Sequence, residues 1–101
     1  MSAPRLSWRR CPGLSYLWEA EVAGLRLRVT PLGDVERPNW HVPQIGDGPD
    51  AIRGKPVLGT EPVEVAQLAA EALAIRVLEL RRRAHANAIA FLEGKSAAPE
   101  G

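Results

Sequence analysis

The stretch 63–93 contains neither glycine nor proline, and this feature most constrains what the chain can fold into. All prolines but one precede it, spread with most of the glycines over residues 1–62. Glycine and proline interrupt helices and mark turns. The sequence therefore predicts short strands and loops in the first part of the chain, followed by one long helix.

The ends of the predicted helix carry their own signals. The segment 59–62 (GTEP) is a helix start, in which Thr60 caps the helix and the proline stands in the first turn. Gly94 follows the last apolar residue as a stop signal. A continuous helix over 62–93 would be about 48 Å long at about 1.5 Å per residue. We therefore expect it to overhang a domain of this size, or to break near residues 85–87.

Two segments with alternating apolar and polar residues, 14–22 and 25–30, predict a β-hairpin. A two-residue turn at Ala23-Gly24 would place apolar pairs on one face: Val22 with Leu25, Ala20 with Leu27 and Trp18 with Val29. The same register places opposite charges on the other face: Glu19 with Arg28 and Glu21 with Arg26. A one-residue slip would spoil both faces. A bulged turn is the alternative, because Ala-Gly is not a favoured hairpin turn.

Residues 5–10 and 39–42 also alternate, so we expect them to extend the hairpin into a sheet. The fold class that follows is α+β, a three- or four-stranded antiparallel sheet packed against one long C-terminal helix. The buried face of the sheet should carry all three tryptophans: Trp8, Trp18 and Trp40. One of them could instead be an exposed anchor for a partner.

The chain has 101 residues, enough for one domain. We place this domain at 1–94, followed by a small, polar and flexible tail at 95–101. The single cysteine excludes an intramolecular disulfide. No apolar run approaches the roughly 20 residues of a membrane helix, and the N-terminus lacks the apolar core of a signal peptide. We therefore expect a soluble, cytoplasmic protein.

The predicted helix has two apolar faces, and a small sheet can cover only one of them. The main stripe is rich in alanine and should pack on the sheet: Ala66, Ala69, Ala70, Leu73, Val77, Leu80, Ala84, Ala88 and Phe91. The second face consists of Leu68, Ile75, Leu78 and Ile89. We expect this face to meet another helix, in a homodimer or in a different protein. The alternatives are partial exposure and a cover formed by the loop 43–59.

A basic run, Arg81, Arg82 and Arg83, lies in the later half of the helix. Glu79 is spaced to pair with Arg82 and Arg83, which would neutralise part of the run. We expect the three arginines to be either a solvated turn of the helix or a contact for the partner.

Sequence motifs of enzymes are absent, and we expect no catalytic residue, no metal site and no cofactor. The two histidines, His41 and His85, have no neighbour at metal-ligand spacing. His41 should point to the exposed side of its strand. Cys11 stands before a turn as an ordinary small residue, and Asp47 and Asp50 are turn formers rather than a cation site.

Nucleic-acid binding is the alternative function. Its candidate contacts are the scattered basic residues Arg9, Arg10, Arg53, Lys55 and Arg81 to Arg83. The net charge of +1 argues against it, because nucleic-acid-binding domains usually carry a clear basic excess.

The placement of tryptophan, glycine and alanine resembles that in small proteins of phages and proteobacterial mobile elements. The matching residues are Leu6-x-Trp8, Trp18-x-Ala20-x-Val22-x-Gly24, Trp40-x-Val42, Gly59-Thr60 and the alanines Ala66, Ala69 and Ala70. The resemblance implies a short antiparallel sheet with one long helix across it. The segment 59–66 is also similar to part of the HicB-type antitoxins, whose Pro-Asp-x-Pro-Gly segment has no counterpart here.

The missing catalytic groups, the long helix and this resemblance together predict a non-enzymatic protein-binding module of phage or mobile-element origin. It would act by occluding a surface of a partner protein, as an antitoxin or an anti-CRISPR inhibitor of host defence does. The expected partner is another protein or a second copy of the chain, with nucleic acid as the alternative and no membrane.

Overall fold

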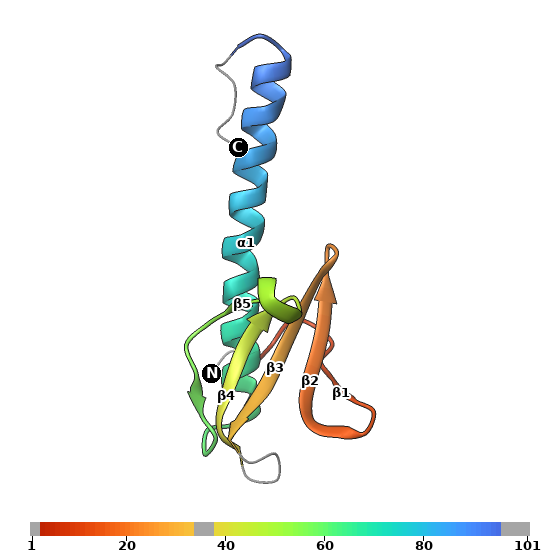
Figure 1. The fold of residues 1–101 in the computed structure, drawn as a ribbon, viewed down its shortest axis with the longest axis vertical. Coiled ribbons are helices and arrows are strands. Elements are labelled where there is room, and N and C mark those ends of the chain that lie inside the picture. The colour runs from red at the N-terminus through yellow and green to blue at the C-terminus, as the bar shows by residue number, and fades with distance from the viewer. Residues whose placement is uncertain (1–2, 34–37, 96–101) are drawn as a thin grey trace.

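A computed structural model of the protein describes residues 3–33 and 38–95. The described chain forms an antiparallel sheet and one long helix, which confirms the predicted α+β class (Figure 1). The strands are β1 (Arg9–Cys11), β2 (Leu14–Val22), β3 (Leu25–Gly33), β4 (Pro38–Ile45), β5 (Ile52–Arg53) and β6 (Val57–Leu58). A short 3-10 helix, η1 (Gly48–Asp50), precedes β5, and the long helix α1 (Val63–Leu92) follows β6.

The sheet is larger than predicted, with six strands in place of three or four. The strand order is β1-β2-β3-β4-β5, and β6 also pairs with β4. The two additional strands arise in the segment 43–59, which the sequence favoured as a loop, with a short extended piece at Val57-Leu58, the residues of β6, as an alternative. Each has two residues, and both pair along β4, β5 opposite Gln44 and Ile45 and β6 opposite Trp40 and His41. Strands this short carry no alternation that could reveal them.

The predicted hairpin register is confirmed at every pair. Trp18, Ala20 and Val22 of β2 lie opposite Val29, Leu27 and Leu25 of β3, and Glu19 and Glu21 lie opposite Arg28 and Arg26. The two residues between the strands, Ala23 and Gly24, have φ angles of 50° and 78°. Positive φ at both positions is what a two-residue hairpin turn of type I′ requires. The hairpin register therefore requires a left-handed backbone conformation at Ala23, which is strained for a residue with a side chain.

Strand β4 faces the opposite way from the prediction. The β3–β4 register sets Ile45 opposite Leu27 and Pro43 opposite Val29, so these residues share the face that packs on the helix. Alternation then turns Trp40 and Val42 to the outer face, where Trp40 is 39% exposed but Val42 is buried, with 8% of its surface exposed. His41 consequently lies on the helix side and is buried, so its predicted exposure was wrong.

The N-terminal segment is not a strand over 5–10, because pairing begins only at Arg9. Leu6 and Trp8 pack against the core as predicted, but from an irregular segment. Its backbone N–H groups at Arg5 and Leu6 donate to the carboxylate of Glu71 on α1 instead of to a neighbouring strand. The helix thus diverts this segment from the sheet.

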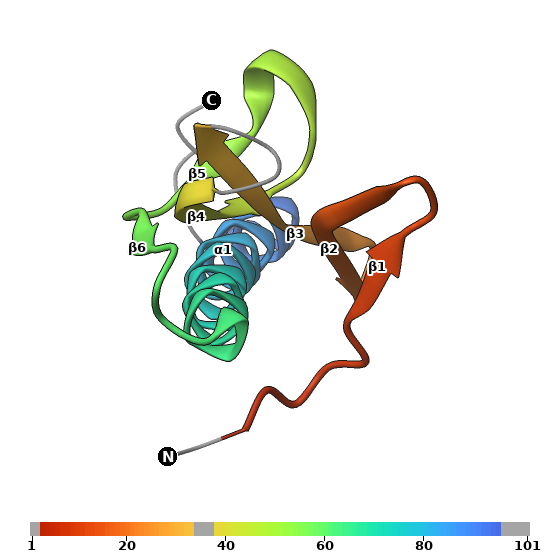
Figure 2. The same cartoon turned by 90° about the horizontal axis from the view of Figure 1, so that it is seen from below.

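Helix α1 is continuous, and only its first half lies on the sheet. It packs on β3 and β4, where Ala66, Ala70 and Ala74 are buried, whereas residues 79–87 are all exposed. The 30 residues span about 45 Å at about 1.5 Å per residue. Figure 1 shows the second half standing clear of the strands, and Figure 2 shows β1 and β2 curving away from the helix. The expected overhang is confirmed, and the alternative of a break near 85–87 is wrong.

The two ends of α1 differ in how well the sequence predicted them. Thr60 is not the cap, because the helix begins at Val63 with Pro62 in the N-cap position. The stop at Gly94 is confirmed. Gly94 has a φ of 75°, its N–H donates to the carbonyl of Phe91, and the N–H of Lys95 donates to the carbonyl of Ala90. These two bonds form a Schellman motif, which satisfies carbonyls at the helix end.

Candidate functional site

The second half of α1 lacks cover from the sheet. We call residues 79–92 the projecting segment. Leu80 is 64% exposed and Leu92 is 81% exposed, and Phe91 and Ile89 are exposed as well. A helical segment of this length is only marginally stable in water without packing. The apolar residues on it therefore mark a surface suited to contact with another molecule.

Most of the predicted main stripe follows a regular heptad spacing, with alternating steps of four and three residues along the whole helix, but Ala69 and Ala88 of that stripe lie beside this line. We call the positions on this line the seam: Ala66, Ala70, Leu73, Val77, Leu80, Ala84, Asn87 and Phe91. The first positions pack on the sheet, and Leu73 and Val77 are half-buried at its border. The rest of the seam continues onto the projecting segment, so the expectation that the sheet covers the whole stripe was wrong. Asn87 is the seam position that the sequence analysis missed, and the four-three spacing could have revealed it.

A shallow groove lies where the seam leaves the sheet. Its apolar wall is formed by Ile52 of β5 together with the seam residues Leu73, Val77 and Leu80. Arg76, Glu79 and Arg83 complete the lining. The groove thus joins the edge of the sheet to the start of the projecting segment in one apolar surface.

The predicted second face does not form one continuous surface. Leu68 and Ile75 lie together in a shallow hollow near Arg5, and Ile75 is 58% exposed. Leu78 packs against the core instead. Ile89 is exposed, but it lies about 21 Å further along the helix than Ile75 at about 1.5 Å per residue.

The basic run is exposed, and its three arginines point to different sides of the helix. Arg81 and Arg83 come directly after and before seam positions, so they flank the seam on its two sides. Arg82 lies on the opposite side of the helix. Among the described residues no ion pair joins Glu79 to Arg82 or Arg83, contrary to the prediction. Hydration of these exposed charges competes with a pair worth only about 0.5 kcal/mol.

The Glu71 carboxylate anchors the N-terminal segment to α1. It accepts hydrogen bonds from the N–H of Arg5 at 2.9 Å, the N–H of Leu6 at 3.1 Å and the indole Nε1 of Trp8 at 2.9 Å. Partial burial acts to raise the pKa of Glu71, but the hydrogen bonds outweigh it and hold the pKa below its ordinary value. This carboxylate therefore has a structural role.

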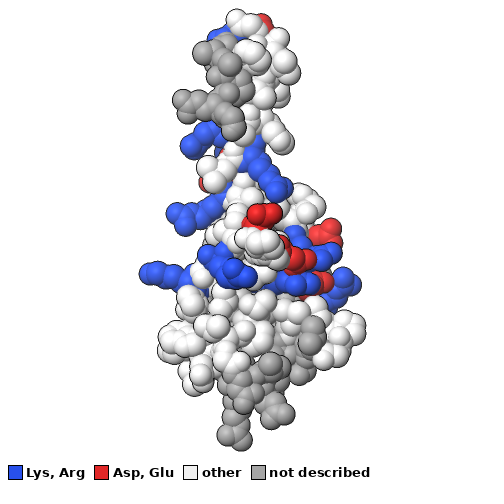
Figure 3. Space-filling model, viewed as in Figure 1, with Lys and Arg blue, Asp and Glu red and all other residues white. Residues whose placement is uncertain are grey.

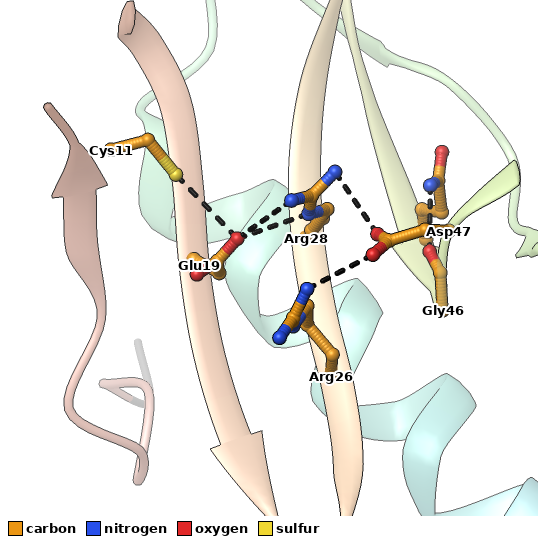
Figure 4. Close-up of polar contacts among 7 residues, drawn as sticks. Cys11, Glu19, Arg26, Arg28, Gly46 and Asp47 are labelled. Atoms are coloured by element: carbon orange, nitrogen blue, oxygen red, sulfur yellow. Dashed lines mark hydrogen bonds and ion pairs between the residues drawn. The ribbon is translucent and has the colours of Figure 1, made fainter. Parts of the chain in front are cut away.

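A polar network covers part of the outer face of the sheet (Figure 4). Arg28 binds Glu19 at 2.9 Å and Asp47 at 3.0 Å, and Asp47 also binds Arg26 at 3.0 Å. The pair between Glu19 and Arg28 is the predicted one, whereas Arg26 pairs with Asp47 although Glu21 lies opposite it in the hairpin. Asp47 is thus occupied by two guanidinium groups, and Cys11 donates to Glu19 at 3.6 Å.

The network shifts the pKa values of two of its members, Glu19 and Cys11. Partial burial acts to raise the pKa of Glu19. The hydrogen bond and positive charge of Arg28 outweigh this effect, so the pKa lies below its ordinary value. Burial and the neighbouring Glu19 carboxylate raise the pKa of the Cys11 thiol. A thiol of raised pKa is a poor nucleophile at neutral pH, so this cysteine is not an activated one.

His41 is the one buried histidine in the described ranges, with 9% of its surface exposed. Its Nδ1 has no hydrogen-bond partner among the residues that the structure describes. Burial lowers the pKa of the imidazole, which keeps it neutral at neutral pH. His41 is therefore a core residue whose charging would oppose folding.

A second exposed apolar set crosses the outer face. Leu32 of β3, Trp40 of β4 and Leu58 of β6 are cross-strand neighbours, and all three are exposed. Trp40 is thus the tryptophan that corresponds to the alternative of an exposed anchor.

The basic residues proposed for nucleic acid do not form one surface. Arg9 and Arg10 lie on β1, and Arg53 lies on β5, with three strands between them. Lys55 follows β5 and is exposed. The guanidinium of Arg10 lies over the ring of Trp18, 5.1 Å from its centre, which uses part of its charge within the fold.

In comparisons with known proteins, no family model, no curated protein and no solved structure matches this chain. Within residues 3–33 and 38–95, histidine, cysteine and carboxylate side chains do not gather in threes as a metal site would need. No helix in the same ranges has the length and apolar character required to cross a membrane.

Proposed function

We propose that the chain is a non-enzymatic protein-binding module, which acts by laying the projecting segment of α1 on a surface of another protein. The observation that carries this proposal is the continuity of the helix and its seam beyond the sheet. Leu80, Phe91 and Leu92 are held in water with no cover from the sheet. Burying a side chain of this size is worth about 1.5–3 kcal/mol, so a partner that covers them gains a large part of a binding free energy.

The narrower form of the proposal comes from the sequence resemblance. It makes the chain a product of a phage or mobile element, acting as an antitoxin or as an inhibitor of host defence of the anti-CRISPR type. The alternative of a nucleic-acid-binding regulator has less support, because its basic residues lie at opposite edges of the sheet.

The test is affinity capture from the native host with mass spectrometry, run with and without nuclease. The wild-type chain should retain a protein partner after nuclease treatment, and a Leu80→Asp, Phe91→Asp double variant should lose it. Circular dichroism must show that the variant keeps its helix. Loss of every partner on nuclease treatment would favour the nucleic-acid alternative, and retention by the double variant would remove the projecting segment from the proposal.

A further inference from the structure

From Arg76 through the projecting segment, the charged side chains that flank the seam are all basic. Arg76 and Arg83 directly precede the seam positions Val77 and Ala84, and Arg81 directly follows Leu80. These are the positions from which side chains reach across to a second helix in a coiled coil. Figure 3 shows basic side chains, in blue, standing out on both sides of the narrow helical part of the molecule, with uncharged surface between them. All three arginines are exposed.

The acidic residues of this region stand further from the seam. Glu79 directly precedes the seam position Leu80, but it also lies two residues past Val77, and at about 100° per residue this turns it further from the seam than Arg76 or Arg83. Glu93 lies two residues past Phe91 in the same way. Glu79 reaches the rim of the groove, where Arg76 and Arg83 also lie. The two flanks of the seam therefore carry three arginines against one glutamate at the rim.

We infer that the projecting segment binds an amphipathic helix of the partner protein whose apolar stripe is flanked by Asp or Glu, an inference that rests on the proposed function. Arg76 and Arg83 would meet acidic residues on one side of the stripe, and Arg81 would meet them on the other. Pairing of opposite charges at these positions sets partner choice in coiled coils. The groove at Ile52 receives one end of the partner helix.

The shape of the seam favours a helix as the occupant. Leu80 and Phe91 are large, whereas Ala84 between them is small and lets a second backbone approach closely. Asn87 adds one polar position, which specifies the register of a helical pair at some cost in stability. An apolar centre between basic flanks also fits an amphipathic helix better than the uniform negative charge of a nucleic acid.

A second copy of the chain fits this surface less well. In a parallel, in-register pairing of two copies, Arg76 of one copy would face Arg81 of the other. Like charges across such an interface disfavour the pairing. The charge pattern therefore selects a different, acidic partner.

The test uses the full chain and two synthetic three-heptad peptides, identical except at the positions beside their leucine seam. The acidic peptide carries Glu at these positions and the basic peptide carries Lys, and repulsion keeps each from associating with itself. Binding is measured by fluorescence anisotropy at low salt. We expect the acidic peptide to bind about tenfold or more tightly than the basic one, because several exposed charge pairs contribute about two- to fivefold each.

Charge reversal supplies the decisive comparison. The triple variant Arg76→Glu, Arg81→Glu, Arg83→Glu should prefer the basic peptide. The matched control Arg82→Glu changes the same kind of charge on the opposite side of the helix, and it should keep the preference for the acidic peptide. Circular dichroism confirms the helix in each variant, and light scattering reports the oligomeric state.

Several outcomes would overturn the inference. They are equal binding of the two peptides, binding of neither, an unchanged preference in the triple variant, and a wild-type dimer that Leu80→Asp dissociates. A short RNA that competes through the same three arginines would also overturn it. The proposed function fails separately, if capture from the host yields no protein that depends on the seam. If a partner is captured but the peptide test fails, the proposed function stands and only the inference of an acidic partner helix is rejected.

Discussion

The indole Nε1 of Trp8 donates a hydrogen bond to Oε2 of Glu71 at 2.9 Å, joining residues 63 positions apart in the chain. The same carboxylate accepts the backbone N–H groups of Arg5 and Leu6. One side chain of the helix therefore holds the N-terminal segment in the space beside the hairpin, where Leu6 and Trp8 complete the core.

Replacing this carboxylate should weaken the fold. Glu71→Ala leaves three N–H donors without their acceptor, and we expect it to lower the free energy of unfolding by about 2–3 kcal/mol. The exposed Glu79→Ala on the same helix should change it by no more than about 0.5 kcal/mol. Urea unfolding followed by tryptophan fluorescence measures both. Equal effects would show that the anchor contributes nothing to stability.

The stability should fall at mildly acidic pH through His41. Its pKa in the folded protein lies below the ordinary 6.5, so the unfolded chain binds a proton more readily than the folded one. The contribution of the neutral imidazole is complete above the unfolded pKa and is lost as the pH falls below it towards the folded value. Thermal midpoints between about pH 7.5 and pH 5 should decline in the wild type and in His85→Gln, and less in His41→Gln. A decline of the same size in His41→Gln would assign it to other groups.

Adjacent substitutions can check which way β4 faces. His41→Lys places an ammonium group at a buried position, and it should cost about 3–5 kcal/mol of unfolding free energy. Trp40→Lys places the charge on the outer face, where it reaches water, and should cost less than half as much. Chemical denaturation of both variants makes the comparison. If Trp40→Lys were the more damaging change, the register between β3 and β4 would be wrong.

Interrupting the projecting segment should leave the stability of the rest of the fold unchanged. Ala86→Pro interrupts the helix beyond the sheet, so the helical signal in circular dichroism should fall while the unfolding midpoint reported by the tryptophans stays unchanged. Ala72→Pro interrupts the half that packs on the sheet, and it should cost about 3 kcal/mol or more. A large loss of stability in Ala86→Pro would mean that the projecting segment supports the core.

Much of the fold follows from patterns between residues close in sequence. The hairpin register could be predicted because its apolar pairs and its charge pairs agree across a two-residue turn. The long helix and its stop at Gly94 could be predicted because the breakers and the apolar spacing are local signals. The start of the helix was predicted wrongly at Thr60, because the helix begins at Val63 with Pro62 in the N-cap position.

The candidate site was predictable only in part. The apolar stripe and Arg81 to Arg83 are visible in the sequence, and so is a helix too long for its domain. The sequence does not show where the sheet ends beneath the helix. The sheet ends near Val77 and Leu78. The second half of the predicted main stripe is therefore the uncovered surface, and the predicted second apolar face is not.

Local order thus accounts for the hairpin, the helix and the α+β class, because each depends on residues a few positions apart. The facing of Trp40 and His41, the anchoring of Trp8 by Glu71 and the limit of the sheet depend on contacts between distant segments. In a strand a shift of one residue reverses both faces, so the apolar residues of β3, packed on α1, decide how β4 is turned. Short strands and a single half-buried carboxylate leave no repeating pattern in the sequence, and they become visible only when the chain is packed.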